Sequence, residues 1–197
     1  MICPNPHRII VVGGSAGGLE ALRELVASLP EDLAAPVLVV LHIPATARSH
    51  LAAILGRGGS LPVVTAEHRD PLVAGTVVVA PPDHHLLVGR RHVMLSHGPK
   101  EKGSRPAIDP LFRSAARHQG ARTIAVLLSG MLDDGSAGML AVRRAGGTTM
   151  VQDPATCGFD SMPLNALAMG GVEQVVTVRR IASLLGTLTA PVAGEDA

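Results

Sequence analysis

The sequence predicts a doubly wound α/β fold, in which a mainly parallel sheet lies between two layers of helices and carries an appended β-hairpin. Short runs of β-branched residues alternate with amphipathic stretches, and Gly and Pro fall between these runs rather than in one block. The 197 residues are 47% hydrophobic and 17% charged, which suits one large core and excludes a disordered chain. We therefore expect one three-layer αβα domain over residues 1–190 and a frayed tail at 191–197.

The expected elements follow from local patterns. A strand is expected where β-branched residues run together between turn residues, and a helix where apolar residues recur every three or four positions. Pro30 ends the first helix, and Pro44 separates the second strand from the next helix. In chain order the expected strands are 8–12, 37–42, 62–65, 76–80, 85–88, 92–95, 123–128, 148–151 and 172–178, and the expected helices are 19–26, 49–55, one from 109, 135–144, 164–169 and 181–188.

Turn and cap residues set several of these boundaries. Gly89-Arg90 separates two short strands, which predicts the appended hairpin. The segment 98–106 is polar and rich in Gly and Pro, so we expect an exposed loop. Asp109-Pro110 predicts a helix start, because an Asp side chain accepts amide hydrogens of the first turn and Pro there gives up no helical hydrogen bond.

Charge and composition exclude several kinds of partner. Seventeen Lys and Arg against sixteen Asp and Glu leave a formal net charge of +1, which does not favour nucleic acid or an anionic membrane. With no Trp or Tyr and two Phe, the chain also lacks stacking platforms for single-stranded nucleic acid. Cys3 and Cys157 stand far apart without a CxxC pattern, so neither a disulfide framework nor a structural zinc site is indicated. We expect a cytoplasmic protein with no signal segment and no direct membrane insertion.

A glycine-rich turn, 13–18, lies between the first expected strand and the first helix. A dinucleotide fingerprint would need Gly where Ser15 stands, and an acidic residue after the second strand, where His42 stands. A nucleophile elbow of the form G-x-S-x-G is present in Gly13, Ser15 and Gly17, and it would hold the serine hydroxyl at a helix N-terminus. The alternative is an ordinary glycine turn in which Ser15 caps the helix.

Two further polar groups stand at strand ends. His42 closes the second strand, and Asp133 and Asp134 follow the strand at 123–128. Because the carboxyl ends of parallel strands meet at one edge of a sheet, these groups and Ser15 can gather in one crevice. There a carboxylate would orient His42 while the histidine takes the proton of Ser15. The chain order Ser, His, Asp differs from that of α/β-hydrolases, and a helix cap is the alternative role for either aspartate.

Together these segments resemble the catalytic domain of the chemotaxis protein-glutamate methylesterases (CheB type). The resemblance runs from about Arg8 to Leu185 and rests on several long motifs in the right order. These are Val11-Val12-Gly13-Gly14-Ser15-Ala16-Gly17-Gly18, Leu41-His42-Ile43-Pro44, Val78-Val79-Ala80-Pro81-Pro82-Asp83-His84-His85-Leu86, Arg105-Pro106-Ala107-Ile108-Asp109-Pro110-Leu111-Phe112-Arg113-Ser114-Ala115-Ala116, Ser129-Gly130-Met131 through Gly138, Gln152-Asp153-Pro154 and Ser161-Met162-Pro163.

The resemblance implies a role for each candidate residue. Ser15 would be the nucleophile, His42 the general base and acid, and Asp134 the orienting carboxylate, with backbone amides near Ala16 or Met131 holding the oxyanion. The implied reaction is hydrolysis of γ-glutamyl methyl esters on glutamate-rich helices of methylated chemoreceptors, with release of methanol. Some members also deamidate receptor glutamines. The implied chemistry needs no metal and no organic cofactor.

Departures from the family pattern keep alternatives open. Full-length members carry an N-terminal receiver domain, whereas this sequence starts almost at the first catalytic strand, so a stand-alone domain with a separate response-regulator partner is expected. Ala16 stands where a hydroxyl residue is common, and Leu132-Asp133 lie in a loop that is more often glycine-rich. A related serine esterase or amidase with another substrate is one alternative. A catalytically silent module that binds a partner through the same fold is the other.

A basic stretch at 90–105 is a candidate docking surface for an acidic substrate. It contains Arg91, Lys100 and Lys102. The alternative is an ordinary solvated hairpin and loop, because exposed charges often contribute little to binding or stability.

Overall fold

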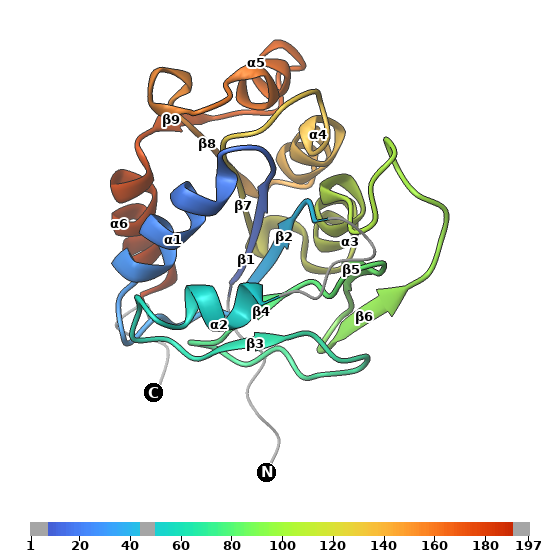
Figure 1. Ribbon diagram of the computed structural model, residues 1–197, viewed down its shortest axis with the longest axis vertical. Helices are drawn as coiled ribbons and strands as arrows, with labels where there is room; N and C mark the ends of the chain where they lie inside the picture. The colour runs from blue at the N-terminus through green and yellow to red at the C-terminus, as the bar shows by residue number, and fades with distance from the viewer. Residues whose placement is uncertain (1–7, 44–49, 191–197) are drawn as a thin grey trace.

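The computed structural model describes residues 8–43 and 50–190, so the predicted tail at 191–197 and the first residue of the helix predicted at 49–55 lie outside the described residues (Figure 1). A seven-stranded parallel sheet has the strand order β3-β4-β2-β1-β7-β8-β9. Its strands are β1 (Ile9–Gly14), β2 (Val37–Leu41), β3 (Val63–Thr65), β4 (Val77–Val79), β7 (Thr123–Leu127), β8 (Thr148–Gln152) and β9 (Gln174–Val176).

Helices cover both faces of this sheet. The helices α1 (Gly18–Ser28), α2 (Leu51–Leu55) and α6 (Val178–Thr189) pack against one face. The other face carries α3 (Ile108–Gln119), α4 (Ser136–Arg144), α5 (Ser161–Ala168) and the separate antiparallel hairpin of β5 (His85–Val88) and β6 (Val93–Ser96). Figure 1 shows α1 and α6 on one side of the sheet and α3 and α4 on the other. The predicted αβα fold with an appended hairpin is confirmed.

The strands are buried on both faces, which explains their continuous apolar runs. Along β1, Ile10 and Val12 belong to the core cluster under α1 and α6, and Ile9 and Val11 belong to the one under α3 and α4. Full burial of each such aliphatic side chain is worth about 1.5–3 kcal/mol. The sheet is therefore stabilised by two hydrophobic cores, one on each of its faces.

Several boundaries differ from the sequence prediction. Helix α5 begins at Ser161 rather than at 164, because Met162 is fully buried in the core and Pro163 is accepted in a first helical turn. Helix α6 begins at Val178, which the β-branched pattern had placed in a strand, because packing buries that side chain with the helix. The short strand β4 belongs to the main sheet, between β2 and β3.

The order of the strands defines where a site can form. The chain leaves β1 toward β2 on one side, and β7 pairs with β1 on the other side. Such a switch point opens a crevice beyond the carboxyl ends of the central strands. The turn after β1, His42 after β2 and the loop after β7 all reach this edge.

Candidate active site

Ser15 lies in the turn between β1 and α1. Its backbone amide donates to the carbonyl of Ser129 (3.0 Å), and the Ser129 hydroxyl donates to the carbonyl of Ala16 (2.9 Å). Gly17 has φ of 69°, and a Cβ at this position would lie 2.8 Å from Ser129 Oγ. Glycine is therefore needed here for its backbone angle and for space. Gly17 also occupies the N-cap position of α1, which has no side-chain cap, so Ser15 does not cap the helix.

His42 connects Ser15 to Asp134. Its backbone amide donates to the carbonyl of Gly14 (3.1 Å), which places the ring at the carboxyl edge. Ring atom Nδ1 lies 3.0 Å from Ser15 Oγ, and Nε2 lies 2.8 Å from Asp134 Oδ2. A carboxylate can only accept, so the neutral ring carries its proton on Nε2 and turns the lone pair of Nδ1 toward the serine hydroxyl. The side chain of His42 is 20% exposed, which leaves the site accessible to a ligand.

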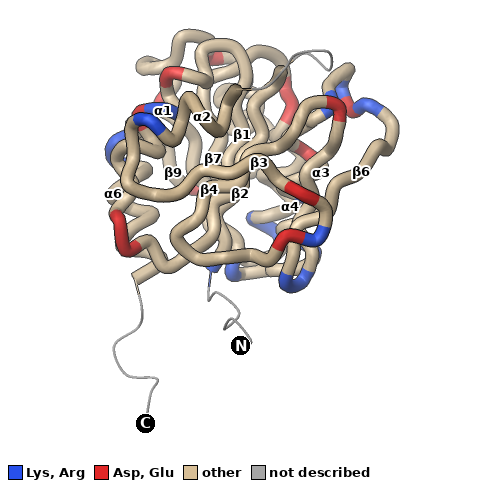
Figure 2. The backbone as a smooth tube through the Cα atoms, turned by 60° about the horizontal axis from the view of Figure 1, so that its bottom comes forward, with Lys and Arg blue, Asp and Glu red and all other residues tan. Residues whose placement is uncertain are grey.

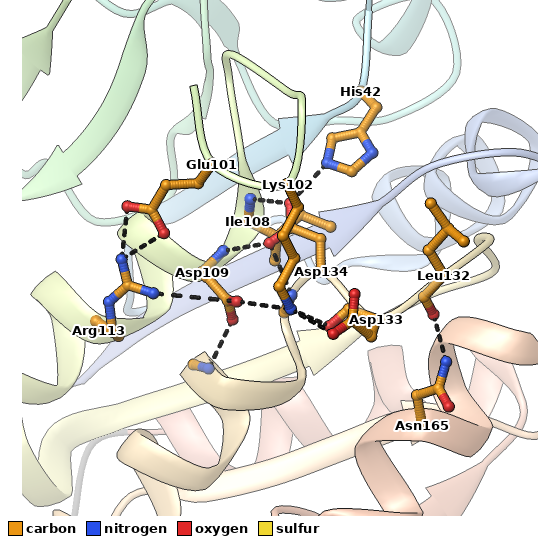
Figure 3. A network of polar contacts seen from close by, with 12 residues as sticks. His42, Glu101, Lys102, Ile108, Asp109, Arg113, Leu132, Asp133, Asp134 and Asn165 are labelled. Carbon is orange, nitrogen blue, oxygen red and sulfur yellow. Dashed lines mark hydrogen bonds and ion pairs between the residues drawn. The ribbon is translucent and has the colours of Figure 1, made fainter. Parts of the chain in front are cut away.

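Asp134 is buried and held by four donors. Besides His42 Nε2, the carboxylate accepts from the backbone amides of Ile108 (2.7 Å), Asp109 (3.0 Å) and Gly135 (2.9 Å). The first two amides open α3 and have no partner within their own helix. Burial raises the pKa of Asp134, but the hydrogen bonds from His42, Ile108 and Asp109 outweigh it, so the pKa lies below its ordinary value. Asp134 is therefore a fixed negative charge beside the imidazole (Figure 3).

The prediction that the side chain of Asp109 caps α3 is wrong. The helix begins at Ile108, and Asp134 supplies the cap from another segment. The carboxylate of Asp109 instead accepts from the amide of Gly138 in α4 (2.7 Å) and pairs with Lys102 Nζ (3.2 Å). Burial raises the pKa of Asp109 and the charge of Asp134 adds to this effect, while Gly138 and Lys102 oppose it.

Asp133 faces away from the imidazole, as Figure 3 shows. Lys102 Nζ donates to the Asp133 carboxylate (2.9 Å) and to its carbonyl (2.8 Å). Burial lowers the pKa of Lys102, but Asp133 and Asp109 outweigh it, so the net pKa is raised. The alternative role of Asp133 as a side-chain cap of α4 is not seen among the described residues, where its backbone carbonyl accepts the Ser136 amide (3.1 Å).

Of the predicted docking residues, Lys100 and Lys102 share one loop, whereas Arg91 lies in the hairpin turn, and their docking role stays a prediction. Lys102 is engaged by two carboxylates, as described above. Arg91 lies in the turn of the hairpin. The carbonyl of the neighbouring Arg90 accepts from the side chain of Gln119, the last residue of α3, whereas Asp134 binds the first amides of the same helix. Lys100 is exposed in the loop that leads to Lys102.

The backbone amides of Ala16 and Met131, the expected oxyanion donors, belong to residues that directly follow Ser15 and Gly130 in the chain. Within the described part of the chain neither amide donates a hydrogen bond. Gly130 packs closely against Ser15, because a Cβ at position 130 would lie 3.0 Å from Ser15 Cβ and would also collide with Met162. Met131 therefore follows a glycine that packs against Ser15, and its amide and that of Ala16 donate to no group among the described residues.

Sequence reasoning missed the groups that support this site. The amides of α3 that hold Asp134 carry no side-chain signal, and Lys102 gave no sign that it would bridge Asp109 and Asp133. Leu132 was noted only as a departure from a glycine-rich loop. It has φ of 66° and is 70% exposed, and its carbonyl accepts from Asn165 (2.7 Å).

The fold and the site define a three-layer α/β protein with a hydrogen-bonded Ser-His-Asp chain at the carboxyl edge of its sheet. A family model described as CheB methylesterase matches residues 10–185, and the chain belongs to this family. The crystal structure of the Thermotoga maritima CheB methylesterase catalytic domain is similar, with a TM-score of 0.89 and 33% identity. The similarity covers 92% of this chain and 98% of that one.

Two similar curated proteins are named protein-glutamate methylesterase/protein-glutamine glutaminase. The group 3 operon protein of Bradyrhizobium diazoefficiens is 39% identical over 182 residues, which cover 90% of this chain and 50% of the relative. Protein 2 of Anaeromyxobacter dehalogenans is 41% identical over 181 residues, which cover 92% and 53%. The chain thus spans about half the length of the curated relatives it matches.

The described residues show two further features of the chain. None of their helices is long and apolar enough to cross a membrane. No group of three or more His, Cys, Asp or Glu among them is arranged to hold a metal ion.

Proposed function

We propose that this chain is a serine hydrolase that removes methyl groups from γ-glutamyl methyl esters on chemoreceptor-type proteins, and that it also deamidates glutamines at such positions. The observation that carries the proposal is the contact of 3.0 Å between Ser15 Oγ and His42 Nδ1, with His42 held by Asp134. Membership of the CheB methylesterase family and the names of the curated relatives support the choice of reaction.

The proposed reaction proceeds in two halves. In the first, His42 takes the proton of Ser15 while Oγ attacks the ester carbonyl, and the amides of Ala16 and Met131 donate to the oxyanion. The intermediate collapses as His42 gives the proton to the leaving methoxide, which departs as methanol. In the second half His42 takes a proton from a water molecule while the water oxygen attacks the acyl carbon. The bond from that carbon to Ser15 Oγ then breaks, His42 returns the proton to Oγ, and the glutamate side chain is released with the serine hydroxyl restored. From a glutamine the first half releases ammonia instead.

Asp134 is proposed to orient and stabilise His42 in both halves of the reaction. Its negative charge stabilises the imidazolium that forms in each half, and its hydrogen bond keeps the ring proton on Nε2. The amides of Ile108 and Asp109 prevent the carboxylate from rotating away. Asp134 is therefore proposed as the orienting carboxylate, and Asp133 is not.

The proposed substrate is a glutamate-rich helix of a methylated chemoreceptor-type protein, with no role for nucleic acid. Chemistry of this kind uses no metal and no organic cofactor, because serine, histidine and water carry every proton and bond change. We place the reaction in the cytoplasm, where a free thiol such as that of Cys157 stays reduced.

Substitution of Ser15 by Ala tests the proposal. With a methylated receptor fragment as substrate, Ser15→Ala reduces methanol release by roughly 10³-fold or more, because the nucleophile is lost. Ser28→Ala, at the exposed end of α1, is the matched control and retains the wild-type rate. Circular dichroism confirms that both variants are folded.

The wild-type protein separates the alternatives. Hydrolysis of a small ester without any release of methanol or ammonia from the receptor would indicate an esterase or amidase with another substrate. Hydrolysis of neither would indicate a silent binding module. A wild-type rate of methanol release in Ser15→Ala would exclude Ser15 as the nucleophile.

A further inference from the structure

A second concave site lies at the amino edge of the sheet. It is a cavity of about 420 Å³ lined by Arg90, Arg91, Arg117, His118 and Arg122. Arg122 ends the short 3₁₀ helix η1 (Gly120–Arg122), directly before β7, whereas Ser15 directly follows β1. Because β1 and β7 are parallel neighbours, the cavity and the Ser15 site lie at opposite edges of the sheet. Figure 2 shows Lys and Arg segments close together in the lower part of the view, below β2 and α4.

The arginines of the cavity come from separate segments. Arg90 and Arg91 form the turn between β5 and β6, and Arg117 and His118 stand in the last turn of α3. Helix α3 has 12 residues, so at about 1.5 Å per residue it separates its two ends by about 18 Å. The same helix therefore presents its first amides to Asp134 at one end and two basic side chains to the cavity at the other.

None of these four arginines has an acidic partner within the described residues. The arginines that do form ion pairs with carboxylates lie elsewhere, and the pairs are Arg105 with Asp83, Arg113 with Glu101 and Asp109, and Arg179 with Glu24. The negative end of the α3 dipole accounts for basic residues in its last turn. It does not account for Arg90 and Arg91, which the hairpin brings to the same place.

Hydrogen bonds hold the backbone segments that carry the arginines of this cavity. Gln119 is buried, and its Nε2 donates to the carbonyls of Gly89 (2.8 Å) and Arg90 (3.0 Å), which ties the hairpin turn to the end of α3. The carbonyl of Arg91 accepts from the amide of Leu72 (3.1 Å). The backbone positions of the arginines are thus fixed before any ligand binds, so little ordering of the backbone opposes binding.

We propose that this cavity binds a compact diphosphate group. Guanidinium groups match phosphate oxygens with paired hydrogen bonds, and four of them without a counter-charge favour a ligand of high charge density. The volume of about 420 Å³ lies within the range of small-molecule sites. An extended acidic peptide spreads its charges at about 3.3 Å per residue and needs a longer groove.

Recognition in this cavity is centred on the phosphates. The lining contains no Phe, and the chain has no Trp or Tyr that could stack on a nucleobase. The diphosphate can come from inorganic pyrophosphate or from a nucleoside diphosphate, since both present the same group. Binding at this edge does not depend on the proposed esterase chemistry at Ser15.

Isothermal titration calorimetry on the whole chain at low ionic strength tests the proposal, with inorganic pyrophosphate as the probe. We expect one site per chain. Arg117→Gln and Arg122→Gln each weaken the affinity at least tenfold. Arg180→Gln, an exposed arginine on α6 with the same change in charge, alters it less than twofold. Ser15→Ala keeps wild-type affinity, so a failure of the esterase proposal would leave this test intact.

Two further ligands, adenosine diphosphate and hexaglutamate, distinguish the possible sources of the bound group. Tighter binding of adenosine diphosphate than of pyrophosphate assigns the site to a nucleotide, and weaker binding assigns it to the free anion. The proposal is overturned if pyrophosphate does not saturate the wild-type protein, or if Arg180→Gln weakens binding as much as Arg117→Gln. It is also overturned if hexaglutamate displaces pyrophosphate at equal charge concentration. Arg90→Gln, in the exposed hairpin turn, replaces any helix variant that melts below the assay temperature.

Discussion

Two neighbouring strand-to-helix turns build the Ser15 site in different ways. The turn between β1 and α1 is short and made of Gly, Ser and Ala, and it presents a hydroxyl. The loop between β7 and α4 is longer, carries the exposed Leu132 and turns Asp134 inward. The two are bonded to each other, because the amide of Ser15 donates to the carbonyl of Ser129.

The difference shows which physical property each turn depends on. The first turn depends on space, since a side chain at Gly17 would collide with Ser129. The second depends on charge and hydrogen bonds, since Asp134 is held by His42 and by the amides that open α3. Size changes should therefore damage the first turn, and changes of charge should damage the second.

The largest expected effect on the rate of methanol release comes from replacing each of the two adjacent aspartates by Asn in turn. Asp134→Asn removes the charge that stabilises the imidazolium, and we expect methanol release to fall by about 10³- to 10⁴-fold. Asp133→Asn breaks only a half-exposed contact with Lys102, so its rate should stay within about threefold of wild type. Measurement of methanol release for both variants, with circular dichroism as the check on folding, makes the comparison. A crippled Asp133→Asn beside an active Asp134→Asn would reverse our assignment.

Substitution in the first turn tests its dependence on space. Gly17→Ala combines a strained backbone angle with a Cβ 2.8 Å from Ser129 Oγ, and we expect it to destabilise the fold by roughly 2 kcal/mol or more. Gly170→Ala has a similar positive φ but no atom within 4 Å of the new Cβ, so it isolates the backbone strain and should cost about 1 kcal/mol. Urea unfolding measures both, and equal losses would argue that space at Gly17 is unimportant.

Helix α4, which follows the second turn, begins with a polar side chain that has no partner in the described ranges of the chain. Ser136 is fully buried, and its hydroxyl makes no hydrogen bond among the residues that the structure describes. Ser136→Ala removes this unsatisfied group and should stabilise the protein by about 1 kcal/mol. Thermal unfolding provides the measurement. A lower melting temperature for this variant would mean that the hydroxyl has a stabilising contact in solution.

Sequence reasoning placed Ser15, His42 and Asp134 together because each follows a buried strand and parallel strands end at one edge. It could not choose between Asp133 and Asp134 from the residues alone, and the family resemblance supplied that choice. The cap of α3 was assigned to Asp109 by a local rule, whereas the packing of the loop after β7 brings Asp134 to those amides.

The arginine cavity escaped sequence reasoning for the same reason. Arg90 and Arg122 are far apart in the chain, and they come together where the hairpin packs against α3 and Gln119 bonds to the hairpin turn. Local patterns thus predicted the elements and their polar ends. They did not predict which of these element ends contact one another in the folded protein, such as the hairpin turn and the end of α3.

The central claim is that Ser15 is the nucleophile of a Ser-His-Asp triad. Peptide mass spectrometry after treatment with a serine-directed phosphonate tests it most directly, because the reagent marks the activated hydroxyl itself. We expect one adduct, on the peptide that contains Ser15, with its formation rate greatly reduced in Asp134→Asn and no adduct in Ser15→Ala. An adduct on Ser129 or Ser161, or loss of methanol release without any adduct on Ser15, would contradict the account.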